Sequence, residues 1–387
     1  MKKNTQFFIV EQKQLVAILT AMQPICNKRS PLDVTTSILF YITPKELIIK
    51  STDLEISFQA SCALEEVTIT QEMSFLVPGK RLFDLVKDLS GLVTFELDGS
   101  RLLVKASRMK CALSIQSAEL FPTLPEKIEN ILHCASEELL AMLEKVVFMI
   151  PQSTTTPALN GLFIEIDANG FALTATDGHC LSHVHNTAWT LQEYHSWLLP
   201  KRAVIELKKI LETSLCAGPI FLGTCGNQIV FSTDTFNFFS KVLTDQYPQY
   251  KPILLHDTFF QLQVLRDDLV GALRRAGSLL AQQFIATKFT FDATHKTITT
   301  HLKNKEIGEI KEEVSLQSYT GENLVIYAYA PYIINGLQNI HQKNITMYIL
   351  SPVKPLICTF DINEHTAGTY IIMPVSASAN NSSESEL

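Results

Sequence analysis

Apolar side chains recur at spacings of three and four residues in three parts of the chain. They form one stripe of Leu15, Ile18, Leu19 and Met22, a second of Leu139, Leu143, Val146 and Ile150, and a third of Leu269, Leu273, Ala276 and Leu280. This spacing predicts three amphipathic helices, each with one buried face. The runs between them, such as residues 46–60 and 161–177, are rich in Val, Ile, Thr and Phe and are interrupted by turn residues, which predicts strands.

A second helical pattern is repeated along the chain. LVPGKRLFDLVKDL (residues 76–89) aligns without gaps with LLPKRAVIELKKIL (residues 198–211), and Pro78 falls on Pro200. A weaker third copy, YAPYIINGLQNI (residues 329–340), again has a proline at the start of the helix, where the missing N–H costs nothing.

Two pairs of short motifs keep nearly the same offset as these helices. Thr52-Asp53 aligns with Thr176-Asp177, and Phe121-Pro122 aligns with Tyr247-Pro248. Ordered matches of this kind predict an internal repeat, in which each unit holds strands and two helices, an α+β domain. We expect three domains and a disordered polar tail, with the bounds 1–128, 129–257, 258–375 and 376–387.

Composition places limits on the class of protein. Hydrophobic residues make up 46% of the chain, which is enough for a packed core, but no apolar run approaches the roughly 18 residues that cross a bilayer. We expect a soluble, cytoplasmic protein that does not enter a membrane. The net charge of -7 would repel nucleic acid on average, so any DNA contact needs a local basic surface. The matching basic positions of the repeated helices, such as Lys80 and Arg202, favour one.

The eight cysteines include no C-x-x-C pair, which argues against a disulfide framework and a finger-type zinc site. The stretch TATDGHCLS (residues 174–182) nevertheless resembles a catalytic or metal centre. Its alternation predicts a strand that ends in a hairpin turn at Asp177-Gly178. Adjacent strand residues point to opposite faces, so His179 and Cys180 are poorly placed to act as base and nucleophile.

His183 and His185 have the spacing of two metal ligands on one strand, but no third ligand is evident nearby. The phosphate-loop, dinucleotide, zinc-protease and nucleophile-elbow motifs are absent. We therefore expect no catalytic residue, no metal, no cofactor and no enzyme activity. A metal- or thiol-dependent enzyme using His179, Cys180, His183 and His185 stays open as the alternative.

The run TYIIMPV (residues 369–375) predicts a closing strand, one face of which could line a groove for an apolar peptide anchor. Taken in order, VPGKRLFDLVKDL, LNGLFIE, TDGH, LPKRAVIEL, YPQY and YIIMP resemble the bacterial sliding clamp, the β subunit of DNA polymerase III. The similarity runs from about residue 7 to residue 375, and the chain looks like a divergent member of that family.

The resemblance implies an architecture and a function. It implies three tandem clamp domains, with sheets outside and two helices each lining a central hole, and a homodimer closed head to tail into a ring. Such a ring encircles duplex DNA without regard to sequence and acts as a processivity factor for the replicative polymerase. Its partners would be the DNA polymerase III α subunit, the clamp loader and other proteins with clamp-binding motifs.

The resemblance also carries over particular residues. By this resemblance, the DNA-facing positions would be Arg29, Lys80, Lys201, Arg202 and Arg275. The peptide pocket between the second and third domains would comprise Leu159, Thr176, Gly178, His179, Leu181, Pro248, Ile253, Val353, Ile371, Met373, Pro374 and Val375. At the dimer interface we expect Cys111 and Leu113 of the first domain to meet Ser278 and Leu279 of the third.

The chain departs from the family pattern at several places. Cys180 stands where the family often has arginine, Pro252 replaces a basic residue, and the loop of residues 151–158 has no basic residue. Residues 376–387 extend beyond the usual end of the family. A clamp-like protein that binds partners without being loaded onto DNA is therefore a further alternative.

Overall fold

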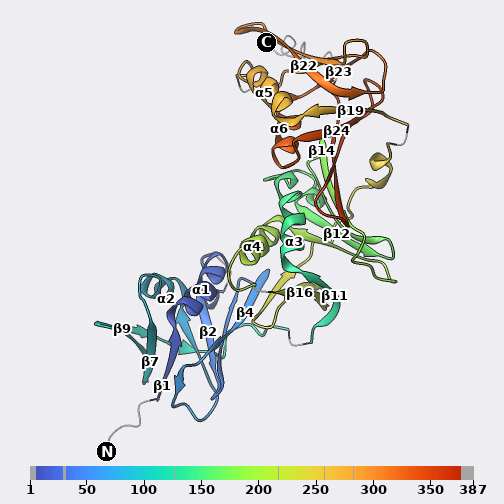
Figure 1. Cartoon of the computed structure of the whole chain (residues 1–387). Helices are drawn as coiled ribbons and strands as arrows, with labels where there is room; N and C mark the ends of the chain where they lie inside the picture. Colours follow the sequence, from blue (N-terminus) through green and yellow to red (C-terminus); the bar gives the residue numbers. More distant parts are fainter. Residues whose placement is uncertain are drawn as a thin grey trace, which may run out of the picture. The chain divides into compact units, whose positions relative to one another are not determined.

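The computed structural model describes residues 6–28, 32–125, 127–216, 218–256, 258–281 and 283–375. They form two compact units, the first drawn from residues 1–140 and 199–243, the second from residues 141–198 and 244–387. Six α-helices occur in the described ranges, two in each third of the chain, and most other elements are strands (Figure 1). The predicted α+β class is confirmed.

The helices of the first unit pack their apolar faces together. α1 (Gln12–Cys26) contacts both α2 (Gly79–Val86) and α4 (Lys201–Leu211). The predicted stripe of α1 is confirmed, because Leu15, Ile18, Leu19 and Met22 are fully buried. α2 and α4 each begin directly after a proline, as the repeat predicts.

Two antiparallel sheets complete the first unit. A five-stranded sheet has the order β5-β1-β7-β8-β9, and a nine-stranded sheet has the order β10-β6-β2-β3-β4-β18-β17-β16-β11. The strands of the first are β1 (Gln6–Glu11), β5 (Glu66–Val67), β7 (Leu92–Asp98), β8 (Arg101–Ala106) and β9 (Met109–Ser114). Those of the second are β2 (Ser37–Ile42), β3 (Glu46–Thr52), β4 (Ile56–Ala63), β6 (Met73–Pro78), β10 (Gln116–Ser117), β11 (Glu129–Ala135), β16 (Pro219–Cys225), β17 (Gln228–Ser232) and β18 (Phe236–Lys241).

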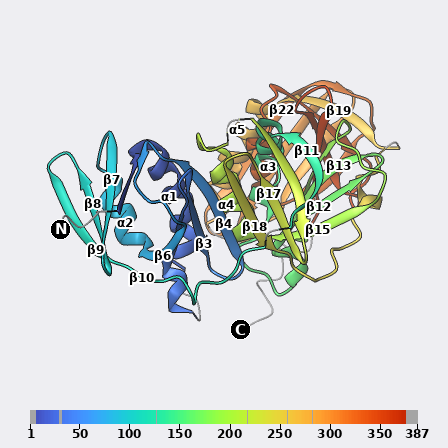
Figure 2. The same ribbon diagram turned by 90° about the horizontal axis from the view of Figure 1, so that it is seen from below.

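The nine-stranded sheet joins two copies of the repeat. β4 from the first copy pairs with β18 from the second, with Phe58 opposite Phe238, and Figure 2 shows β4, β18 and β17 side by side. Phe58 also packs against Phe236, with ring centroids 5.5 Å apart. The two copies therefore share one continuous hydrogen-bonded layer.

The second unit is built around one antiparallel arrangement with the order β15-β12-β13-β14-β26-β25-β24-β19-β22-β21-β20-β23. α5 (Arg266–Gly277) and α6 (Ala330–Gln338) pack against each other in this unit. The strands are β12 (Gly161–Asp167), β13 (Gly170–Thr176), β14 (Cys180–Asn186), β15 (His195–Pro200), β19 (Phe260–Leu265), β20 (Thr287–Asp292), β21 (Thr297–Asn304), β22 (Gly308–Tyr319), β23 (Leu324–Ala328), β24 (Asn344–Ile349), β25 (Leu356–Asp361) and β26 (Thr366–Ile372).

Two of the predicted helices end earlier than their apolar stripes. α3 (Ser136–Glu144) stops before Val146 and Ile150, and α5 stops before Leu280. All three side chains are still buried, but in the tighter turns that follow each helix. Val146 stays on the apolar side because the 3-10 turn places it on the same side as Leu143, three residues earlier.

Candidate functional site

Turns of the same construction occur at equivalent places in the repeat. Asp53 Oδ1 accepts hydrogen bonds of 3.0 and 2.9 Å from the backbone N–H groups two and three positions later. Asp177 Oδ1 does the same at 2.9 and 2.7 Å. The next residue has a positive φ in both turns, 77° at Leu54 and 91° at Gly178. The aligned Thr-Asp pairs are therefore a structural repeat, and the predicted turn at Asp177-Gly178 is confirmed.

The second of these turns lies beside the end of β26, and the two segments form the candidate site. The backbone N–H of Met373 donates to the carbonyl of His179 at 2.9 Å. Beside this hydrogen bond, Leu181 in β14 is paired with Ile371 in β26. A side chain built at Gly178 would meet Leu159 at 3.9 Å. The structure thus brings together these predicted residues from three separate segments.

Several of the predicted apolar residues are exposed to solvent. Ile253 and Met373 are each 37% exposed, and Val353 is 78% exposed. Val353 lies in the turn before β25, whose first residue pairs with Ile372, next to Met373. Leu255, which was not among the predicted residues, is 69% exposed. Exposed apolar groups are typical of interaction surfaces where they form one contiguous patch.

The other predicted residues are distributed between the surface and the core. Leu159, Leu181 and Ile371 are buried, so they can only support the site from beneath. The more accessible members are Thr176, Gly178, His179, Pro248, Pro374 and Val375. The His179 ring is stacked on Tyr332 of α6, with centroids 5.6 Å apart.

Residues 247–253, here called the Pro248 segment, are anchored by two buried tyrosines. The Tyr247 ring stacks on Phe163 with centroids 4.6 Å apart, and its hydroxyl donates to the carbonyl of Thr174. The Tyr250 hydroxyl donates to the carboxylate of Glu165, which is only 6% exposed. Burial and this carboxylate raise the pKa of Tyr250 above its ordinary value.

Glu165 was missed in the sequence, although a signal was present. It lies between Ile164 and Ile166 in GLFIEID, a strand with buried residues on both faces. A carboxylate in such a strand needs hydrogen-bonding partners, because an unpaired buried charge is costly. Partners come from segments that no local pattern connects to this strand.

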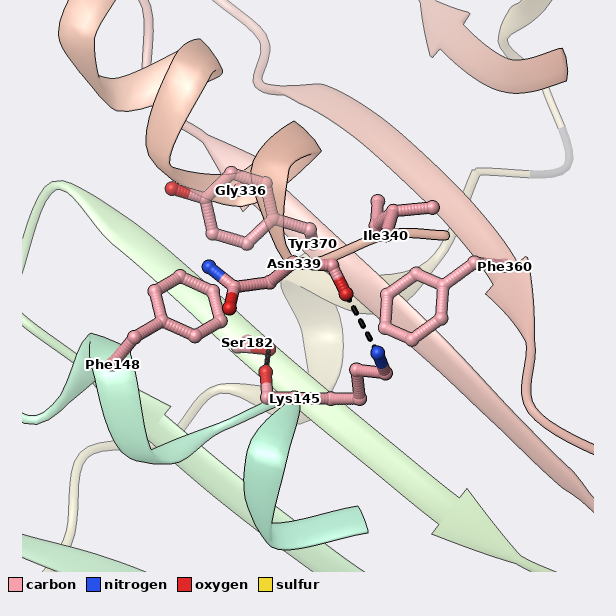
Figure 3. A pocket seen from close by; sticks show the side chains of 8 residues that line it. All are labelled: Lys145, Phe148, Ser182, Gly336, Asn339, Ile340, Phe360 and Tyr370. Carbon is pink, nitrogen blue, oxygen red and sulfur yellow. Dashed lines mark hydrogen bonds between the residues drawn. The ribbon is translucent and has the colours of Figure 1, made fainter. Parts of the chain in front are cut away.

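Elsewhere in the second unit, the turn after α3 reaches the end of α6 (Figure 3). Lys145 is 8% exposed, and its ammonium donates at 2.8 Å to the carbonyl of Asn339, just past α6. Ser182 donates to the carbonyl of Lys145. A Cβ at Gly336 would lie 1.9 Å from the Tyr370 ring, so only glycine fits there. These contacts link the turn after α3 and α6 to β14 and β26, the two strands next to the candidate site.

The side chains of the alternative enzyme hypothesis are not arranged for chemistry. Cys180 is buried, and burial raises the pKa of its thiol to about 12, which keeps it protonated at neutral pH. His179, by contrast, is exposed. Burial lowers the pKa of His183 to about 3, and its Nδ1 is 2.9 Å from the Thr174 hydroxyl. Within the described ranges, no group of three or more potential ligands could hold a metal.

The predicted DNA-facing residues have different surroundings. Arg29 lies outside the described residues. Lys80 is exposed near the start of α2, and Lys201 is half-buried at the start of α4. Arg275 near the end of α5 forms a bidentate ion pair with Glu312, and the side chain of Arg275 is 57% exposed.

Arg202 has a structural partner. Its guanidinium pairs with Asp53, whose side chain is fully buried, and donates at 2.9 Å to the carbonyl of Pro24. The side chain of Arg202 is only 30% exposed. This arginine therefore ties the Thr-Asp turn of one repeat to the second helix of the next.

The residues predicted for an interface lie at the margins of their units. Cys111 and Leu113 are half-buried in β9, the terminal strand of its sheet. Ser278 is exposed just after α5, and Leu279 packs against a small core that includes Ala276 and Leu280. In the described part of the chain, no helix is both long and apolar enough to span a membrane.

Comparisons with known proteins cover almost the whole chain. Residues 6–125, 133–249 and 256–376 match the models of the N-terminal, central and C-terminal domains of the DNA polymerase III beta subunit. The beta sliding clamp of Pseudomonas putida is 26% identical over 373 residues, which is 95% of this chain and 99% of that protein. That of Staphylococcus epidermidis is 27% identical over 372 residues, or 94% and 96%.

Solved structures have the same fold. The DNA polymerase III subunit beta of Pseudomonas aeruginosa matches with a TM-score of 0.86 at 24% identity, covering 95% of this chain and 99% of the other. The beta subunit of Thermotoga maritima matches with a TM-score of 0.84 at 24% identity, covering 96% and 99%.

Proposed function

The chain belongs to the DNA polymerase III beta subunit family, and from this premise we propose that two copies close head to tail around duplex DNA. The closed dimer would slide along DNA in the cytoplasm and tether the replicative polymerase, without chemistry of its own. The repeat carries this proposal, because three similar domains on each of two chains can close a ring by heterologous contacts.

Two strand edges support the proposed closure. β9 ends its sheet, and residues 308–313 of β22 pair only with β21 among the described strands. An unpaired edge is a template for a strand of another chain. Lys110 on β9 and the glutamates 309 and 313 on β22 have opposite charges, which favours contact between the two edges. Cys111 and Leu113 would then lie at the interface with Ser278 and Leu279.

The proposed DNA contacts are Lys80, Lys201 and Arg275, with Arg29 as the fourth candidate. Exposure lets Arg275 exchange its carboxylate partner for a phosphate. Arg202 is different, since moving it would leave the buried carboxylate of Asp53 without its main partner. Contacts to phosphates do not depend on the DNA sequence, so they suit a ring that slides along DNA.

The candidate site would receive short peptide segments of the polymerase α subunit, the clamp loader and other clamp-binding proteins. Its exposed apolar residues, Ile253, Val353 and Met373, would take apolar anchors of such a peptide. The exposed imidazole of His179, in the Thr176–His179 turn, would help to orient the peptide.

Sedimentation at micromolar concentration tests the proposed ring. We expect a particle of twice the 43.4 kDa chain mass. Leu113→Asp, which places a charge on the half-buried face of β9, should convert it to monomer without loss of secondary structure. A stable monomer of the unmodified chain at this concentration would contradict the proposal.

A further inference from the structure

Glu165 is an ionisable group in the interior of the second unit. It belongs to β12, where its neighbours Ile164 and Ile166 are buried, and it is itself only 6% exposed. A carboxylate in such a place is stable only when charged or hydroxyl donors replace the water it has lost. The residues that supply these donors are therefore the residues that the carboxylate keeps in position.

Three donors converge on Glu165 from outside its strand. The hydroxyl of Tyr194 donates at 2.9 Å, the hydroxyl of Tyr250 donates to the other oxygen, and the ammonium of Lys251 lies at 3.0 Å. Tyr250 and Lys251 both belong to the Pro248 segment. The ammonium of Lys251 also lies 5.8 Å from the centre of the Tyr194 ring, which joins the donors to one another.

The Pro248 segment alternates between anchored and exposed residues. Tyr247 and Tyr250 are 7% and 4% exposed, whereas Pro248 is exposed and Ile253 is 37% exposed. The N–H of Ile253 donates to the carbonyl of Tyr250 at 3.0 Å, at the start of the short 3-10 helix η4 (Lys251–Leu254). Because Ile253 is hydrogen-bonded to Tyr250, the buried position of Tyr250 determines how the Ile253 side chain is oriented at the surface.

We infer that Glu165 is a positioning residue for partner binding: it touches no peptide, but fixes the Pro248 segment so that Pro248 and Ile253 meet the peptide. The inference rests on the proposed peptide site. The part of that site at His179 and Met373 is held by a separate backbone hydrogen bond, in which Glu165 takes no part.

The test compares Glu165→Gln with Tyr250→Phe in the full-length protein. The glutamine keeps the shape of the side chain but removes the charge. The phenylalanine removes only one hydroxyl donor, so it is the milder variant and tests the inference if Glu165→Gln does not fold. Glu193→Gln is the matched control, because Glu193 lies beside Tyr194 in sequence and its side chain is 87% exposed. Binding is measured by surface plasmon resonance against the immobilised DNA polymerase III α subunit of the same organism.

We expect the dissociation constant to rise about tenfold in Glu165→Gln, less in Tyr250→Phe, and to stay unchanged in Glu193→Gln. Hydrogen exchange distinguishes the positioning role from a general loss of stability, because a general loss would not accelerate exchange at one of two amides selectively. The Ile253 amide should exchange faster in Glu165→Gln, while the Met373 amide should exchange as in the unmodified chain.

Unchanged affinity of both variants, with the unmodified chain binding normally, would overturn the inference. Equal acceleration at Ile253 and Met373 would also overturn it, because Glu165 would then only stabilise the fold. Failure of the unmodified chain to bind the α subunit would instead refute the proposed function, and the inference with it.

Discussion

The ion pair between Arg202 and Asp53 leads to the sharpest prediction about stability. Arg202→Ala removes the guanidinium that pairs with a fully buried carboxylate and caps the carbonyl of Pro24. Loss of one partner of a buried pair typically costs about 3–5 kcal/mol. We expect about 2–3 kcal/mol here, because Arg202 is 30% exposed and the ammonium of Lys28 stays 3.8 Å from Asp53.

Hydrogen exchange measures this cost where it arises. The amide of Ile56, which donates to Asp53 Oδ1, should exchange roughly 30- to 150-fold faster in Arg202→Ala, the equivalent of about 2–3 kcal/mol. Lys208→Ala on the same helix is the control, since Lys208 forms a partly exposed pair with Glu212 and should cost about 0.5 kcal/mol or less.

A double-mutant cycle separates the ion pair from other effects. Asp53→Asn keeps an oxygen to accept the two turn amides but removes the charge, and combining it with Arg202→Ala gives the coupling between the two side chains. Equal costs for Arg202→Ala and Lys208→Ala, or a coupling near zero, would refute the assignment of Arg202 as a tie between repeats.

Three further predictions concern the second unit. Met373→Ala with Pro374→Ala should abolish peptide binding and leave the circular dichroism spectrum unchanged; unaltered affinity would contradict the site. Gly336→Ala should lower the free energy of unfolding by about 1–3 kcal/mol in urea titration, because its methyl group would overlap the Tyr370 ring; an unchanged urea midpoint would show that the ring moves aside freely. The folded-state pKa of His183, about 3, lies below its ordinary 6.5, so the unfolded chain takes up the proton first and stability falls as the pH drops through this window. His183→Gln should therefore lose less stability than the unmodified chain between pH 7 and pH 5, and equal losses would contradict the buried, neutral imidazole.

Much of the fold was predictable because its signals are local. The apolar spacing of Leu15 to Met22, the prolines before α2 and α4, and the turn at Asp177-Gly178 all correspond to elements of the structure. Helix ends were less predictable, since Val146 continues the apolar spacing after α3 has ended.

The contacts that determine residue roles were not predictable, because they join distant segments. Lys80 and Arg202 occupy matching positions in the repeat, yet only Arg202 meets a buried carboxylate, which lies 149 positions away in sequence. Glu165 depends in the same way on Tyr250, 85 positions away. The residue type alone shows that these side chains can carry a charge. The role of each charge depends on its partner, and the tertiary fold determines which partner it meets.

The central claim is that the protein holds DNA by encircling it. The most direct measurement is retention on nicked circular plasmid in high salt, after incubation with the clamp loader of the same organism and ATP, before and after the plasmid is linearised. High salt screens phosphate contacts, so only a closed ring should remain bound. We predict retention on the circle and loss once the DNA is cut. Absence of retention on the circle, with a loader shown to be active on another clamp, would contradict the account.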